Sequence, residues 1–219
     1  MDVFQALQQR RSVRAFLPQV PSADTVRALM EGAASAASGG NMQPWRVVAL
    51  TGEPLAQAIA LAAQAQPQEH PERLSYPENL WEPYRSRRFD NGEALYQSIG
   101  AAREDKVSRL VQLAKNTTFF GAPVGLFVLI DERMSQPQWV DLGIYLQSLM
   151  LLAVEQGLAT CAQGFWRRYE HALTEHLQIP KPYCIAFGVA LGYEDTTAPI
   201  NTLRANRAPL EEWAQLRGF

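Results

Sequence analysis

The segment Arg10-Arg11-Ser12-Val13-Arg14 concentrates the residue types that bind a small anion. It places three guanidiniums and one hydroxyl within five residues, with no acidic side chain among them. A guanidinium is a planar fork of donors that matches the oxygens of a phosphate. The segment therefore indicates a phosphate-binding site. Cations at the end of a short helix would also complement the helix dipole, so the segment alone leaves both interpretations open.

Two further segments have a similar ambiguity. In Ser38-Gly39-Gly40-Asn41-Met42-Gln43-Pro44-Trp45, the glycines allow a ligand to approach the backbone closely, and the Asn41 and Gln43 carboxamides both donate and accept hydrogen bonds. These groups suit the edge of a heteroaromatic ring, but an ordinary turn uses the same residues. Near the other end of the chain, Arg204 and Arg207 precede Pro209. They are either a second anion-binding element or a solvated turn.

Other chemistries lack the residues that they need. The chain has no Gly-x-Gly-x-x-Gly motif, no Walker loop and no Gly-x-Ser-x-Gly elbow. With two cysteines and three histidines, a zinc site is not expected, and Cys161 and Cys184 are predicted to be reduced core residues. Twenty basic and 22 acidic side chains give a net charge of −2, which argues against a general nucleic-acid binder.

Helices and strands alternate along the chain without a repeat, which predicts an α+β fold with a mixed sheet layered by helices in one domain of residues 1–219. The longest predicted helix, 137–156, is apolar nearly all round, so it is expected to be central or at a subunit interface. Its apolar run is too short to cross a bilayer, and no targeting segment is visible, so the cytoplasm is the expected location. The other predicted helices are 2–10, one that follows the N-cap Ser22, 53–66, 92–113 and a short one after Pro209, and the predicted strands are 46–50, 124–130, 158–162 and 184–191.

The composition changes between Pro67 and Asp90, where prolines, arginines and aromatic residues replace the Ala-rich pattern. We expect an irregular excursion rather than a second domain. It is a candidate lid or substrate-facing segment, or equally an arm that wraps a partner subunit. Its residues Arg85, Arg87 and Arg88 would either favour an acidic substrate, such as a carboxylated nitroaromatic, or form a solvated face.

Together, the three candidate segments (residues 10–14, 38–45 and 203–210) resemble those of the nitroreductase family of FMN-dependent oxidoreductases. Their order and spacing match that family over nearly the whole chain. Ala162-Gln163-Gly164-Phe165 resembles the family segment that passes the flavin, and Gly188–Tyr193 resembles the strand before its C-terminal arm. The resemblance implies a nitroreductase-like FMN-binding fold and an intertwined homodimer that binds FMN at its interface. Gln163 departs from the Glu that many classical members carry.

The resemblance also implies roles for single residues. Arg10 and Ser12 would hold the FMN phosphate with Arg207 and Arg204, and Arg11 would lie beside them. Arg14 would lie near flavin N1 and the C2 carbonyl, where a guanidinium stabilises the negative charge of the reduced ring. The backbone of Gln163 or Gly164 would approach N5, and no side chain need be a covalent catalyst or metal ligand. The turn residues expected at the cofactor are Ser38, Gly39, Asn41 and Gln43.

The activity implied is the reduction of a nitroaromatic or similar electron-poor small molecule. NADH or NADPH would deliver a hydride to the flavin, and the acceptor would then occupy the same face in a ping-pong cycle. A flavin-based dehalogenase, a flavin-fragmenting enzyme and a non-catalytic flavin-binding protein are alternatives. A phosphate-ligand module without flavin is the alternative from the residues alone.

Overall fold

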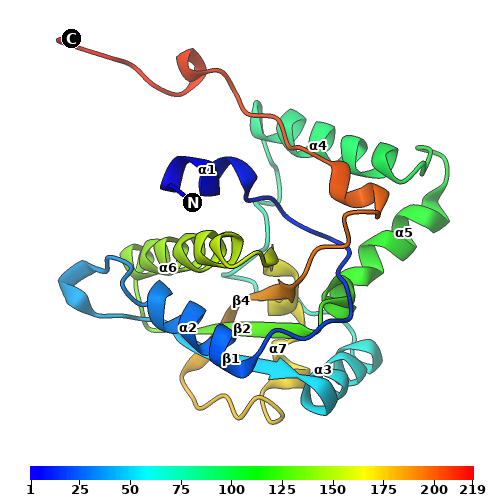
Figure 1. Cartoon of the computed structure of the whole chain (residues 1–219), viewed down its shortest axis with the longest axis vertical. Coiled ribbons are helices and arrows are strands. Elements are labelled where there is room, and N and C mark those ends of the chain that lie inside the picture. The colour runs from blue at the N-terminus through cyan, green and yellow to red at the C-terminus, as the bar shows by residue number, and fades with distance from the viewer.

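A four-stranded sheet with the order β1-β2-β4-β3 lies at the centre of the computed structural model, which describes residues 1–219 (Figure 1). The strands are β1 (Arg46–Thr51), β2 (Val124–Asp131), β3 (Ala159–Gln163) and β4 (Tyr183–Gly192). All three strand pairs are antiparallel, and the one parallel pairing is an isolated bridge between Ser12 and Thr160. The predicted α+β class is confirmed, in a form whose sheet is antiparallel.

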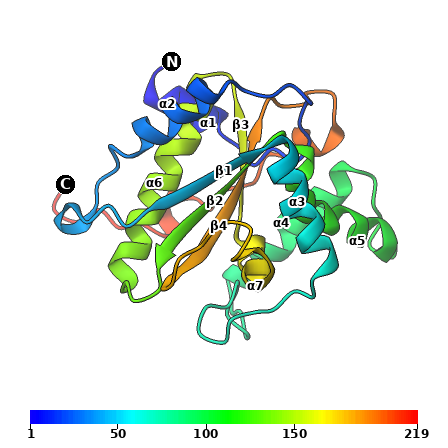
Figure 2. The ribbon, with the colours of Figure 1, turned by 90° about the horizontal axis from the view of Figure 1, so that it is seen from below.

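Helices cover both faces of this sheet (Figure 2). The helices α2 (Ala23–Ala33) and α6 (Gln136–Glu155) pack on one face, and α3 (Gly52–Gln64) and α7 (Glu170–Leu173) pack on the other. Strand β2 is buried along its whole length, because its alternate side chains enter the two layers in turn. The short helix α1 (Val3–Gln9) lies outside α6.

The helix starts follow from local capping. Asp2 and Gln5 form a capping box at α1, and the Ser22 hydroxyl accepts the Thr25 N–H at the start of α2. Helix α6 buries Leu142 and Leu149, but it leaves Val140 and Ile144 on an exposed face. One chain alone therefore buries only part of the apolar surface of α6.

The region after residue 83 differs from its prediction. The single helix expected at 92–113 is wrong: α4 (Tyr84–Ser98) and α5 (Lys106–Ala114) are separate helices. Gly100 turns the chain with a φ of +69°, and Asp105 then caps α5. The excursion is therefore helical from Tyr84 onward. No residue of α4 is buried, because its sequence carries no apolar stripe.

Two smaller predictions concern the end of the chain and the cysteines. The helix expected after Pro209 is only a 3-10 turn at Leu210–Glu212. Cys161 and Cys184 are free and buried, as predicted. None of the helices has the length and hydropathy that a bilayer crossing needs.

Candidate functional site

The residues that follow α1 run along the outer edge of β3. The Val13 N–H donates to the Thr160 carbonyl at 3.0 Å, and farther on the Leu17 N–H donates to the Tyr193 carbonyl at 2.8 Å. Two strand ends thus fix the direction of the segment 12–17. The alternation along an extended backbone then sets which side chains face outward.

Asn201 fastens this segment from the other side. The buried Asn201 side chain accepts the Arg14 N–H at 2.8 Å and donates to the carbonyls of Ala15 and Asp195, each at 2.9 Å. Every polar group of the carboxamide therefore has a partner. Sequence reasoning missed Asn201, because one Asn before the late arginines has no spacing that links it to residues 14 and 15.

Four of the predicted phosphate and flavin residues gather at this edge. Burial lowers the pKa of Arg10, and the like charge of Arg207 lowers it further. Burial raises the pKa of the Cys161 thiol, while the nearby Arg14, Ser12 and Arg10 oppose that shift. The structure thus brings Arg10, Ser12 and Arg14 near Cys161 of β3, and it brings Arg207 near Arg10.

The positive charge of this cluster has no counterion within the chain. Arg10 forms no ion pair, and Arg207 donates only to the carbonyls of Ala205 and Asn206 beside it. Two close guanidiniums repel one another unless an anion lies between them. The donors present, with the Ser12 hydroxyl, therefore fit the phosphate of FMN.

Arg11 and Arg204 differ from their neighbours. The Arg11 guanidinium lies 2.5 Å from a carboxylate oxygen of Glu194, so its charge is already neutralised. Arg204 donates to the carbonyl of Asn201 at 3.1 Å and is exposed. Glu194 was not singled out in the sequence, and its pairing makes Arg11 a link between the segment 12–17 and the end of β4. The roles of Arg11 and Arg204 beside a phosphate stay predictions.

The turn of residues 38–43 is shaped by its own hydrogen bonds. The Ser38 hydroxyl accepts the Gln43 N–H at 3.1 Å, and the Gly39 N–H donates to the Asp141 carboxylate of α6 at 3.2 Å. Asn41 and Gln43 adopt left-handed backbone angles, with φ of 55° and 48°, and both side chains are exposed. Positive φ angles are uncommon outside glycine and cluster in functional loops.

One chain does not bring this turn to the arginines. The turn contacts α6 near its start, whereas Ser12 and Arg14 lie beside β3, which follows the end of α6 (Figure 1). The helical rise from Asp141 to Glu155 separates the two places by roughly 20 Å. The predicted cofactor residues therefore form two groups on one protomer.

A cavity of about 880 Å³ opens beside the arginine cluster. Its inner wall includes Arg14, Cys161 and Gly164. The Gln163 side chain turns into the protein, where it donates to the carbonyl of Asn116 at 2.9 Å and accepts the Trp166 N–H at 3.3 Å. The amide that replaces the expected Glu is therefore a buried link, and Asn116 is a lining residue that the sequence analysis missed.

The excursion and α4 form the outer wall of this cavity. This wall carries aromatic and charged side chains. The volume of the cavity lies within the range of small-molecule binding sites. Its position supports a substrate-facing role for the excursion, which stays a prediction. The lining residues from this part of the chain include Glu69, Ser75, Tyr76, Arg85, Arg88 and Phe89.

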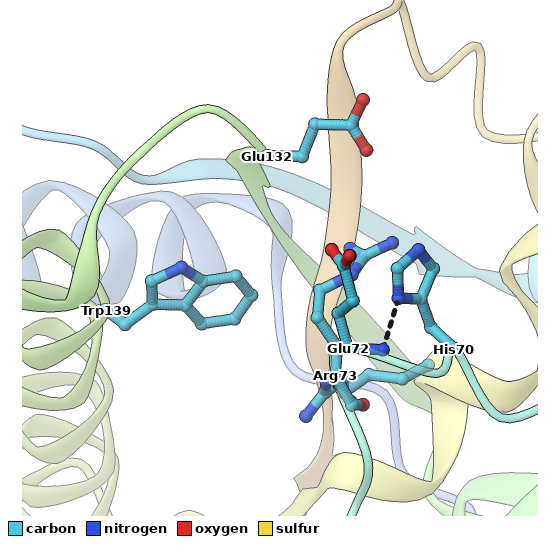
Figure 3. A pocket seen from close by; sticks show the side chains of 6 residues that line it. His70, Glu72, Arg73, Glu132 and Trp139 are labelled. Carbon is cyan, nitrogen blue, oxygen red and sulfur yellow. Dashed lines mark hydrogen bonds between the residues drawn. The ribbon is translucent and has the colours of Figure 1, made fainter.

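Whereas the large cavity is lined by Glu69, Ser75 and Tyr76 of the excursion, a second, more polar cavity of about 570 Å³ is lined by His70, Glu72 and Arg73 (Figure 3). The Glu72 N–H donates to His70 Nδ1 at 3.2 Å within it. Arg167 lines both cavities, and burial followed by the charge of Arg73 lowers the pKa of Arg167. No group of three or more His, Cys, Asp or Glu side chains with a metal-binding arrangement occurs in the chain. The cavity is lined by His70, Glu72, Arg73, Glu132, Trp139 and Arg167.

Comparisons with known proteins agree with this geometry. A family model described as "Nitroreductase family" matches residues 7–193. The chain is 36% identical over 211 residues to a 4-nitrobenzoate reductase of Pseudomonas putida, a match that covers 96% of this chain and 93% of that protein. A nitrobenzene nitroreductase of Ectopseudomonas oleovorans is 32% identical, with 94% of this chain and 93% of that protein covered.

Two solved structures resemble the fold closely. The crystal structure of an FMN- and NADPH-dependent nitroreductase, NfnB, from sphigopyxis sp. strain HMH has a TM-score of 0.96 and 39% identity, with both chains fully covered. The FMN-dependent nitroreductase NfnB from Mycobacterium smegmatis, solved in complex with NADPH, has a TM-score of 0.90 and 30% identity, and covers 99% of this chain and 100% of that one.

Proposed function

The chain belongs to the nitroreductase family, and from this membership we propose that it is an FMN-dependent oxidoreductase that uses NADPH or NADH to reduce nitroaromatic compounds. The observation that carries the proposal is the group of uncompensated guanidiniums beside β3, next to a cavity large enough for an aromatic ring system. When bound, FMN would supply two-electron transfer between a reduced nicotinamide and an electron-poor acceptor.

The chain's own residues would bind and tune this cofactor. Arg10, Arg207 and the Ser12 hydroxyl would hold the phosphate through charge-assisted hydrogen bonds. Arg14, which lines the cavity, would place its charge beside the ring and stabilise the reduced anion. Gly164 would let the backbone approach the ring, because it has no side chain on the cavity wall.

We also propose a homodimer in which each site combines two chains. The 38–43 turn lies too far from the arginine cluster to reach the same ligand within one chain, so a partner would supply it. Exposed apolar residues support such an interface, since Phe4 of α1 is 69% exposed and Val140 of α6 is 64% exposed. The last residues of the chain, beyond the 3-10 turn at Leu210–Glu212, extend away from the body, as an arm around a partner would (Figure 1).

The proposed location is the cytoplasm, and two free, buried cysteines support it because thiols stay reduced there. The proposed partners are a second copy of the chain and a small-molecule electron acceptor.

The test is a purification followed by steady-state kinetics. The purified protein should be yellow, should release FMN on denaturation, and should oxidise NADPH faster when nitrobenzene is added. Double-reciprocal plots at several acceptor concentrations should be parallel, because both substrates use one site in turn. A colourless protein that does not take up FMN would overturn the proposal, and a flavoprotein without acceptor-dependent turnover would reduce it to a flavin carrier.

A further inference from the structure

Arg88 differs from every other arginine of the excursion. Arg85 donates to Glu82 at 2.7 Å, and Arg87 pairs with Glu212 at 2.7 Å. Arg88 forms no ion pair and no hydrogen bond, and its guanidinium lies 4.2 Å from the ring centroid of Tyr76. Of the three arginines that the sequence could not tell apart, the structure leaves only Arg88 with a charge that no group of the chain satisfies.

The face of α4 that carries Arg88 is the face that lines the large cavity. Arg85, Arg88, Phe89, Gly92 and Tyr96 all line it, at helical spacings of three and four residues. Arg87 does not line it, because it lies on another side of the same helix and holds the C-terminal segment through Glu212. Two neighbouring residues with the same charge thus face different surroundings.

The carboxylates of the cavity are unavailable to Arg88. Glu69 pairs with Arg168 at 3.1 Å, and Glu93 pairs with Arg109 at 2.5 Å. The cavity carries five arginines and only these two carboxylates, so its lining has a positive excess. Aromatic rings complete the lining, as the side chains of Tyr76, Phe89, Tyr96, Phe120 and Phe165 all face this space.

An unpaired guanidinium above an aromatic ring, in a cavity of further rings, suits an aromatic ligand with an acidic substituent. The cation would take the carboxylate in a bidentate pair, and the ligand ring would pack among the side-chain rings. We infer that Arg88 is the specificity-determining residue for the electron acceptor, and that it selects nitroaromatics that carry a carboxylate over neutral ones. This inference rests on the proposed function, since it names the substrate class of that site.

The experiment compares two isosteric acceptors, 4-nitrobenzoate and 4-nitrobenzamide, in the FMN-loaded wild type and in Arg88→Gln. The wild type should favour the carboxylate in kcat/KM, and Arg88→Gln should lower that preference roughly ten-fold or more, the usual range for a charge-assisted hydrogen bond. Turnover of 4-nitrobenzamide should change little. Arg87→Gln is the matched control, because it removes the same charge from the same helix without touching the cavity, and it should keep the preference.

A binding measurement separates this inference from the activity. Calorimetric titration of 4-nitrobenzoate without NADPH should show tighter binding than 4-nitrobenzamide in the wild type, and Arg88→Gln should remove the difference. Equal losses for both ligands would overturn the inference and make Arg88 a structural residue of the excursion, and an unchanged preference would overturn it as well. If neither acceptor is reduced by the wild type, the proposed function fails, while the titration still decides whether Arg88 binds the carboxylate.

Discussion

At the scale of single residues, the like charges of Arg10 and Arg207 repel one another until an anion binds between them. Removal of one should therefore weaken ligand binding without weakening the fold. We expect Arg207→Ala to lower FMN affinity about ten-fold or more, because a charge-assisted pair to phosphate is lost. The stability of the flavin-free protein should stay the same or rise, since a repulsion disappears.

Fluorescence titration with FMN and thermal unfolding of the flavin-free protein measure these two effects. Arg217→Ala is a suitable control, because Arg217 is exposed and bonds only to Gln215. Unchanged FMN affinity in Arg207→Ala would remove this residue from the site.

Arg14 should act on the energetics of the flavin rather than on its retention. Arg14→Gln is expected to lower the two-electron midpoint potential of bound FMN, because the reduced ring loses a countercharge. Each 1.4 kcal/mol of lost stabilisation corresponds to about 30 mV. A spectrophotometric redox titration measures the shift, and Arg14→Lys, which keeps the charge, should restore most of it. A raised potential in Arg14→Gln would contradict the role.

At the scale of elements, Asn201 holds the segment 12–17 against the sheet through three side-chain hydrogen bonds. Asn201→Ala leaves the Arg14 N–H without a partner and removes one of the two hydrogen bonds that the carbonyls of Ala15 and Asp195 each accept, so we expect the free energy of unfolding to fall by about 2–4 kcal/mol. FMN affinity should fall too, because the segment 12–17, which carries the Ser12 hydroxyl, loses its anchor. Chemical denaturation of the flavin-free protein measures the change in the free energy of unfolding. The neighbouring exposed variant Asn206→Ala should have almost no effect, and equal stability of both variants would exclude the anchoring role.

The elements that the sequence predicted well are those with a buried side and a local cap. Strand β2 and helix α2 have strong apolar patterns, and their predicted positions agree with the structure. The break between α4 and α5 was missed, because α4 buries no residue and Gly100 looks like a glycine tolerated inside a helix until its φ of +69° is known.

The candidate site follows the same division. The arginines and amides could be found from type and spacing, since a phosphate or a ring edge demands them. The pairing of Arg11 with Glu194 and the anchoring by Asn201 depend on contacts between residues more than 180 positions apart, as the separations of 183 and 187 show. No local pattern encodes such contacts, so only the folded chain reveals which arginines are free.

At the scale of the whole molecule, the division of the cofactor residues predicts complementation between two defective chains. An Asn41→Ala/Gln43→Ala variant and an Arg207→Ala variant should each bind FMN poorly as homodimers. When both are co-expressed with different tags, a doubly purified heterodimer should regain one intact site in two, because one pairing unites the two unaltered groups.

Flavin content and NADPH oxidation per heterodimer measure the recovery. A heterodimer no better than its parents would show that each chain builds its site alone. Elution of the wild type at the monomer mass would contradict the dimer itself.

The separation of the 38–43 turn from the arginine cluster has a consequence for how the holoenzyme arises. A ligand held by two polypeptides cannot be enclosed before those polypeptides meet, so subunit association and cofactor loading become a single linked equilibrium. Dilution would then release flavin along with subunits, and added FMN would favour assembly in return. Protein concentration thus becomes a control on how much of the enzyme carries its cofactor.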